Sequence, residues 1–269
     1  MECLGFSGTT SMASILEEQF DDIYVIHGSR NAVSRDKIGV NNQSPGEFVN
    51  SMLQINAETK KYVVALHCTF LPSKILPLCQ KAYIDFKILV RNPEKQIMSC
   101  FSWAMKKVML GDTEIPNQIR EFQIEMSQFF RLNNIKNNIE NKVYLWAARR
   151  VMAFNADAAN ENSQFCKMED ILGSNKSFCE AFNINKTMEK SFIQNKELNS
   201  HTSFLSQLKL KQKQFEFPEC AKILSGIKVH FNSRRMNILN LSEQMGYEKP
   251  SIKIAPYNFF DIYSENHYS

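Results

Sequence analysis

The sequence lacks any long hydrophobic run. Its longest apolar stretch, residues 62–71, is interrupted by His67 and Thr69. It is much shorter than the roughly 18–20 residues that a membrane-spanning helix requires. The polar Glu2 and the flexible Gly5 stand where a secretion signal would carry its charged and apolar regions. We therefore expect no membrane span and no secretion signal.

The sequence also lacks closely spaced cysteine pairs. Its seven cysteines form no CxxC motif, and their number is odd. Secreted disulfide scaffolds and structural zinc sites usually carry even, closely spaced sets. We expect reduced, buried thiols in a cytoplasmic protein that contains neither a disulfide framework nor a metal.

A strong excess of one charge is missing as well. The formal net charge is +4, and charged residues make up 22% of the chain. Such a mild excess permits an anionic ligand but does not indicate a nucleic-acid partner. With 269 residues, of which 43% are hydrophobic, the chain suits one large α/β domain or two small ones.

The pattern near the start of the chain is strand, turn, helix, strand. Residues 2–6 predict a short buried strand, 7–11 a turn, 12–20 a helix and 23–26 a second strand. This β-α-β spacing is typical of a parallel sheet and of the α/β class. Residues 33–46 predict a surface loop. Further strands are predicted at 61–68, 85–91 and 165–170, and further helices at 48–56, 73–82, 92–111, 119–130, 135–154, 178–182 and 238–245.

The first turn carries Ser7, Gly8, Thr9, Thr10 and Ser11. A turn between a strand and a helix directs backbone N–H groups and the positive end of the helix dipole at one point, which favours an anion. The loop lacks the lysine and the glycine spacing of nucleoside triphosphatases. A tight turn before a well-capped helix is an equally good interpretation of the loop alone.

Three further residues stand at or after the carboxyl ends of predicted strands, where parallel sheets bind ligands. Arg91 offers a bidentate donor for a phosphate, and Ser99 adds a hydroxyl in the next helix. His67 ends an apolar strand and can act as a general base near neutral pH. Taken singly, each is more often structural: a salt-bridged arginine, a serine within a helix and a core histidine.

Together these motifs resemble the sulfotransferase superfamily, which transfers a sulfuryl group from 3′-phosphoadenosine 5′-phosphosulfate (PAPS). The family's Ser-Gly-Thr-Thr loop matches residues 7–10, and its histidine strand matches Ala65-Leu66-His67. Its Arg-Asn-Pro motif, with a serine eight residues after the arginine, matches Arg91-Asn92-Pro93 and Ser99. A later acidic stretch before a helix matches residues 168–172.

The resemblance implies a three-layer α/β/α fold with a central parallel sheet, similar to that of P-loop nucleotide-binding proteins. It implies one domain over 1–269, with core motifs in 1–185 and a variable part in 186–269 that covers the nucleotide and the acceptor. The loop from Ser7 to Ser11 would hold the 5′ end of PAPS. Arg91 and Ser99 would hold the 3′-phosphate, with Arg234 of the Ser233-Arg234-Arg235 stretch as a further ligand.

By the same resemblance, His67 would deprotonate the acceptor, and adenosine 3′,5′-bisphosphate (PAP) would leave without help from a metal. The acceptor would be a hydroxyl or amine of a small molecule or glycan. Phe6 and Ala65 replace two lysines of the family. We hypothesise that Arg30 supplies the missing positive charge, although a solvated loop arginine is as good an interpretation.

Two other functions remain open. The missing loop lysine favours a sulfotransferase-like protein that binds a nucleotide without transferring sulfate. A small-molecule kinase is less favoured, because the sequence offers neither a Walker lysine nor an obvious carboxylate for Mg²⁺ after the third strand. No motif specifies the acceptor or the oligomeric state.

Overall fold

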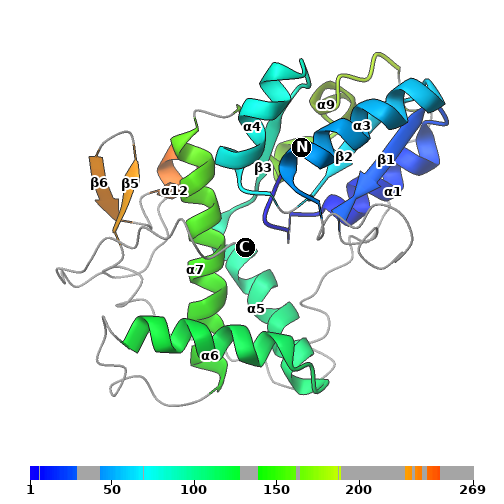
Figure 1. The fold of residues 1–269 in the computed structure, drawn as a ribbon. Helices are drawn as coiled ribbons and strands as arrows, with labels where there is room; N and C mark the ends of the chain where they lie inside the picture. The colour runs from blue at the N-terminus through cyan, green and yellow to red at the C-terminus, as the bar shows by residue number, and fades with distance from the viewer. Residues whose placement is uncertain are drawn as a thin grey trace. The chain divides into compact units, whose positions relative to one another are not determined.

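The computed structural model describes most of the chain as two compact units, residues 1–91 with 161–199 and residues 92–160 with 200–269 (Figure 1). The described residues are 1–5, 7–28, 43–68, 70–127, 139–161, 164–186, 188, 228–231, 234–237 and 241–248. Among them, no helix combines the length and the apolar character that crossing a membrane requires.

The first unit mixes short parallel strands with helices, as the α/β pattern predicts. Its strands are β1 (Ile23–His27), β2 (Tyr62–Leu66), β3 (Lys87–Val90) and β4 (Gln164–Lys167). Its helices are α1 (Thr9–Gln19), α3 (Pro45–Thr59), α4 (Pro72–Lys81), α8 (Met168–Ile171) and α9 (Asn175–Ala181). Residues 168–170, predicted to be strand, are therefore helical.

The strands form two parallel pairs. β1 pairs with β2 from Ile23↔Tyr62 to His27↔Leu66. β3 pairs with β4 from Lys87↔Gln164 onward. Parallel pairing brings the carboxyl ends of neighbouring strands to the same edge.

The segment Met1–Cys3 joins the two pairs. On one side, the Met1 nitrogen donates to Ala65 O over 2.7 Å, and His67 N donates to Met1 O over 3.3 Å. On the other side, Glu2 N donates to the Lys87 carbonyl over 2.9 Å, and Leu89 N donates to the Glu2 carbonyl over 2.8 Å.

Met1 thus bonds to Ala65 and His67, and Glu2 bonds to Lys87 and Leu89. Hydrogen bonds from one residue to two residues that stand two positions apart on the adjacent strand are the pattern of parallel pairing. The spatial order is therefore β1, β2, Met1–Cys3, β3, β4. The predicted strand over 2–6 is shorter than expected, because the chain bends at Leu4 and Gly5.

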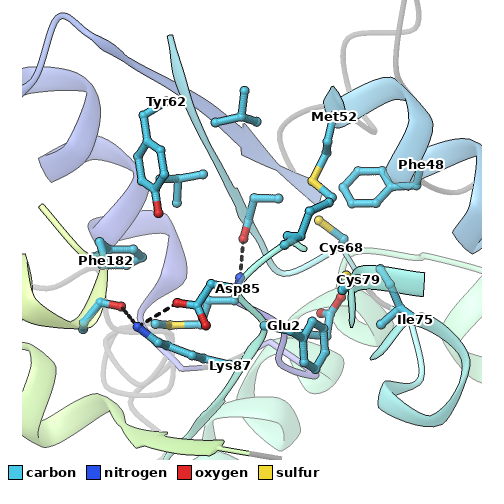
Figure 2. Close-up of a pocket in the computed structure, with 17 residues that line it drawn as sticks. Glu2, Phe48, Met52, Tyr62, Cys68, Ile75, Cys79, Asp85, Lys87 and Phe182 are labelled. Carbon is cyan, nitrogen blue, oxygen red and sulfur yellow. Dashed lines mark hydrogen bonds and ion pairs between the residues drawn. The ribbon is translucent and has the colours of Figure 1, made fainter. Parts of the chain in front are cut away.

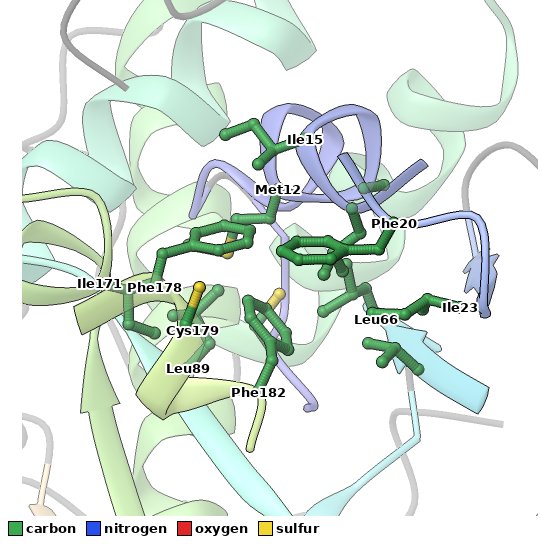
Figure 3. Packing of buried hydrophobic residues seen from close by; sticks show 14 residues of the cluster. Met12, Ile15, Phe20, Ile23, Leu66, Leu89, Ile171, Phe178, Cys179 and Phe182 are labelled. Carbon is green, nitrogen blue, oxygen red and sulfur yellow. The ribbon is translucent and has the colours of Figure 1, made fainter. Parts of the chain in front are cut away.

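Two buried clusters lie against the strands. The first packs Met12 and Leu16 of α1, and Phe20 directly after this helix, against Leu66 and against α9 (Figure 3). The second collects residues of α3 and α4 with the ends of β1 and β2: Ile26, Phe48, Val49, Met52, Cys68, Ile75 and Cys79. Alternate residues of one strand face opposite sides, so Val64 and Leu66 join the first cluster, while Val63 and Ala65 pack against the second.

The second unit is mainly helical. Its helices are α5 (Pro93–Met109), α6 (Glu114–Ser127), α7 (Ile139–Asn160) and α12 (Leu241–Gln244). The predicted cap of α5 is confirmed, because Asn92 Oδ1 accepts from Lys95 N over 3.2 Å. Its strands β5 (Lys228–Phe231) and β6 (Arg234–Asn237) pair antiparallel, and the sequence pattern did not predict them.

Candidate functional site

The loop between Met1–Cys3 and α1 has the geometry of a helix N-terminus. Gly8 is the N-cap residue in the left-handed conformation (φ 73°), and Met12 N donates to Gly8 O over 3.1 Å. The helix therefore begins at Thr9 rather than at the predicted Met12, and Thr9–Ser11 form its first turn. First-turn N–H groups are not used by the helix's own hydrogen-bond ladder, so they suit an anion.

The hydroxyls of the loop lie at different depths. Ser7, Thr9 and Ser11 are buried, whereas Thr10 is exposed. Ser7 Oγ donates to Gly5 O over 3.1 Å, which ties the turn to the end of the preceding segment. Ser7 therefore shapes the loop, and Thr10 is the hydroxyl best placed to meet a ligand from solvent.

Helix α8 lies directly against the loop. A β-carbon at Gly8 would come within 3.1 Å of Met168 Sδ and 3.4 Å of Leu172 Cδ1. The stretch 168–172, which the sequence singled out as an acidic stretch leading into a helix, therefore packs against the predicted phosphate loop. Close packing here explains why a residue without a side chain occupies position 8.

His67 lies beside the same loop. Its ring packs on Gly5, where a β-carbon would come within 2.9 Å of His67 Cε1. His67 Nδ1 is 3.0 Å from Cys3 O. A carbonyl oxygen only accepts, so Nδ1 is the donor, and the neutral imidazole carries its lone pair on Nε2.

The backbone of His67 is unusual as well. Its φ of 54° lies in the left-handed region, which non-glycine residues rarely adopt. Such conformations persist where surrounding contacts hold them, and they cluster at functional sites. The contacts with Cys3 O and Gly5 are the constraints visible here.

Cys3 supports both the loop and the histidine. Gly5 N donates to Cys3 Sγ over 3.3 Å, and Cys3 Sγ is 3.7 Å from His67 Nδ1. Burial, and then the negative charge of Glu2, raises the pKa of the Cys3 thiol well above its ordinary value. Cys3 is therefore a neutral structural thiol rather than a nucleophile.

The motif search missed His27 at the end of β1. This side chain is only 2% exposed, and its ring centroid is 5.8 Å from that of His67. The sequence did contain a signal for this residue, because His27 is a polar side chain at the carboxyl end of a predicted parallel strand. Cys3 offered no comparable signal, because its partner His67 is 64 positions away in the sequence.

The remaining predicted residues are spread over both units. Arg91 follows β3 and is half-buried, so the strand order places it at the same edge as the loop and His67. Ser99 is buried within α5, and Arg234 lies in β6; both belong to the second unit. Phe6 and Arg30, like Ser233, lie outside the described residues.

A separate cavity of about 80 Å³ lies at the other end of the strands. It is lined by the amino-terminal part of β2, by residues 84–87 and by apolar side chains such as Phe48 and Met52 (Figure 2). The loop, His67 and Arg91 do not line it, so it is not the predicted site.

Lys87 closes one wall of that cavity. Its ammonium group donates to Ala181 O (2.9 Å) and pairs with Asp85 at 3.0 Å (Figure 2). It also donates to Asn183 Oδ1 over 3.2 Å. Burial alone would raise the pKa of Asp85, but hydrogen bonds from Lys87 and Asn183 outweigh it and lower that pKa. The group ties the start of β3 to the end of α9.

Six cysteines lie in the described part of the chain, and all of them except the half-buried Cys166 are buried. Cys3, Cys68, Cys79, Cys100, Cys166 and Cys179 are all free, and Cys220 lies outside the described residues. Among described residues, no group of three or more histidine, cysteine or acidic side chains is arranged to hold a metal ion.

The site thus comprises an anion-suited helix N-terminus, a constrained histidine beside it and an arginine at the same edge. We compared the chain with known proteins at three levels. No protein-family model, no curated protein and no solved structure matches it.

Proposed function

We propose that this chain is a PAPS-dependent sulfotransferase with a three-layer α/β/α fold. The support for the fold is the parallel order β1, β2, Met1–Cys3, β3, β4, together with buried clusters on opposite faces of β2. In such a fold, ligands bind at the carboxyl ends of the strands. The loop, His67 and Arg91 all follow those ends.

In this proposal, the donor binds across that edge. The first-turn N–H groups of α1 and the Thr10 hydroxyl hold the 5′-phosphosulfate. Arg91 holds the 3′-phosphate through its guanidinium group. PAP is the product, and the chemistry requires no metal.

His67 acts as the general base. Its Nε2 takes the proton from an acceptor hydroxyl, and the acceptor oxygen attacks the sulfur in line. The bond between the sulfur and the donor's 5′-phosphate oxygen breaks, and PAP leaves with that electron pair. The single observation that carries this role is the ring of His67 on Gly5, with Nδ1 held by Cys3 O at 3.0 Å.

Negative charge develops on the departing phosphate and requires a nearby cation or dipole. The sequence carries Phe6 where sulfotransferases carry the loop lysine. We assign this task to Arg30, which follows β1 in the sequence by three residues, together with the positive end of the α1 dipole. The acceptor is a small-molecule or glycan hydroxyl, and the protein is cytoplasmic.

A second candidate function is nucleotide binding without transfer. The absence of lysine from residues 5–11 favours it, because amides and hydroxyls bind a phosphate but stabilise a leaving group less well. In that case Arg30 is a solvated residue, and PAP is a ligand rather than a product.

Two measurements test these functions. PAP should raise the melting temperature, because it binds the folded state alone, and labelled sulfate should pass from PAPS to members of an acceptor panel. Stabilisation without transfer would support the nucleotide-binding protein. Stabilisation by ATP with Mg²⁺ but not by PAP would support a kinase.

A His67→Asn variant should keep the PAP-induced stabilisation and lose at least about a hundredfold in turnover, the usual contribution of a general base. Tyr83→Asn is the matched control, because Tyr83 is 98% exposed. Turnover that survives in His67→Asn removes the base assignment.

A further inference from the structure

The two imidazoles of His27 and His67 are close enough to influence each other's protonation. Their centroids are 5.8 Å apart, and their planes are tilted by 57°. The backbones next to the two rings are in close contact, because a β-carbon at Gly28, which follows His27, would overlap His67 O. The ends of β1 and β2 are thus packed backbone to backbone at the point where the two rings meet.

Among the described residues, neighbouring segments contribute further ionisable groups near the pair. Segment Met1–Cys3 contributes the Met1 nitrogen and the buried Glu2 carboxylate, whose Oε1 accepts from Cys3 N over 2.9 Å. Burial, and then the charge of Glu2, raises the pKa of the Cys3 and Cys68 thiols, so both are neutral. Arg91 follows β3, beyond Met1–Cys3 in the strand order.

The two imidazoles differ in burial. His27 is 2% exposed, whereas His67 is half-buried, and desolvation disfavours the cation more at the deeper site. Once His67 is charged, repulsion across 5.8 Å opposes a second charge at His27.

We propose that His27 is a positioning residue for His67, and that the two imidazoles form a coupled pair that carries at most one positive charge. His27 packs as an uncharged ring against His67 and keeps Nδ1 directed at Cys3 O. Its part in catalysis rests on the proposed function, because His67 must become an imidazolium when it deprotonates the acceptor. A neutral His27 lets it do so without facing a second positive charge.

The coupling can be measured without any enzymatic assay. The chain has five histidines, so the ring signals of histidine-labelled protein can be followed by NMR from pH 5 to 9. His67→Asn should move the titration of His27 to higher pH by about 0.5 to 2 pH units, the range given by Coulomb's law at this separation in water and in a protein-like dielectric. Tyr83→Asn, a surface change from ring to amide, should leave it in place.

Wild-type protein gives a second readout if His67→Asn does not fold. Each ring signal should then show two inflections, because each senses both protonations. An unmoved His27 titration in folded His67→Asn, or single-step curves for both rings in the wild type, would overturn the coupling.

Activity supplies the test of positioning. His27→Phe keeps a ring against His67 and should retain most of kcat, whereas His27→Asn should lower kcat more than it changes KM. Equal losses of kcat in the two variants would overturn the positioning role. A protein that shows coupled titration but no transfer from PAPS would contradict the proposed function and leave the histidine pair intact.

Discussion

The ring of His67 lies against the α-carbon of Gly5, so the histidine occupies space that any side chain at position 5 would need. A β-carbon there would come within 2.9 Å of Cε1 and 3.1 Å of Nε2. Gly5 also has φ of 103°, which residues with a side chain rarely adopt. The predicted phosphate loop and the proposed base therefore form one packed arrangement.

Gly5→Ala should displace His67 and strain the loop. We expect a loss of about 1–3 kcal/mol in the free energy of unfolding, the usual effect of an overpacked site, and a large loss of turnover. Urea denaturation and a transfer assay measure both. Gly46→Ala is the control, because nothing lies within 4 Å of its β-carbon and alanine favours helix α3 by about 0.5–1 kcal/mol. Wild-type turnover in Gly5→Ala would show that His67 does not depend on this contact.

Lys87→Met should destabilise the first unit without touching the proposed site. It removes the hydrogen bonds to Ala181 O and Asn183 Oδ1 and the ion pair with Asp85. Loss of charged hydrogen bonds from a largely buried group should lower the free energy of unfolding by about 1–3 kcal/mol. Lys74→Met, at an exposed position of α4, is the control. Equal stability of the two variants would show that the Lys87 contacts contribute little.

The buried thiols predict a loss of stability at alkaline pH. Burial raises the pKa of Cys79 to about 11 and that of Cys100 to about 12, and it raises those of Cys3 and Cys68 as well. The thiols ionise more readily in the unfolded chain, near their ordinary value of 9.0. Stability should therefore be constant below about pH 8 and fall above about pH 9, by up to about 1.4 kcal/mol per pH unit for each thiol.

Denaturation curves from pH 7 to 10.5 measure this fall, and Cys79→Ala should make it shallower. Alkylation by iodoacetamide at pH 8 gives an independent check, since Cys3 and Cys68 should react only after unfolding. Rapid labelling of either residue in the folded protein would contradict their burial.

Ser44→Ala should weaken the start of α3. Ser44 Oγ accepts from Glu47 N over 3.3 Å, and Glu47 Oε2 accepts from Ser44 N over 2.7 Å, which is a complete capping box. Loss of such a cap costs about 0.5–2 kcal/mol, measured by thermal or urea unfolding. Ser51→Ala, within the same helix, should be nearly neutral, because Ser51 Oγ bonds back to the Glu47 carbonyl. A larger effect from Ser51→Ala would contradict the capping role.

Local patterns predicted much of the fold. The β-branched runs before His67 and Arg91 became β2 and β3, and Asn92-Pro93 predicted the start of α5 within a residue. These elements are determined by neighbouring residues, through pleating and capping.

Features that depend on distant contacts were not predicted. Gly8 acts as an N-cap without a capping side chain, so the start of α1 at Thr9 has no sequence signal of the usual type. The contact of Cys3 with His67, and that of His27 with His67, require the ends of separate strands to meet. The strand β6 carries consecutive arginines, Arg234 and Arg235, and lacks the alternation that identifies a half-buried strand.

The three residues Met1–Cys3 hold together two strand pairs that are otherwise far apart in the sequence. If this segment detaches, the backbone hydrogen bonds that link the β1–β2 pair to the β3–β4 pair and the Gly5 N–Cys3 Sγ contact of the loop are lost together. Amide hydrogen exchange should therefore find the N–H groups of His67, Leu89 and Gly5 exchanging through one shared opening. The candidate site would then stay assembled only as long as Met1–Cys3 keeps these hydrogen bonds.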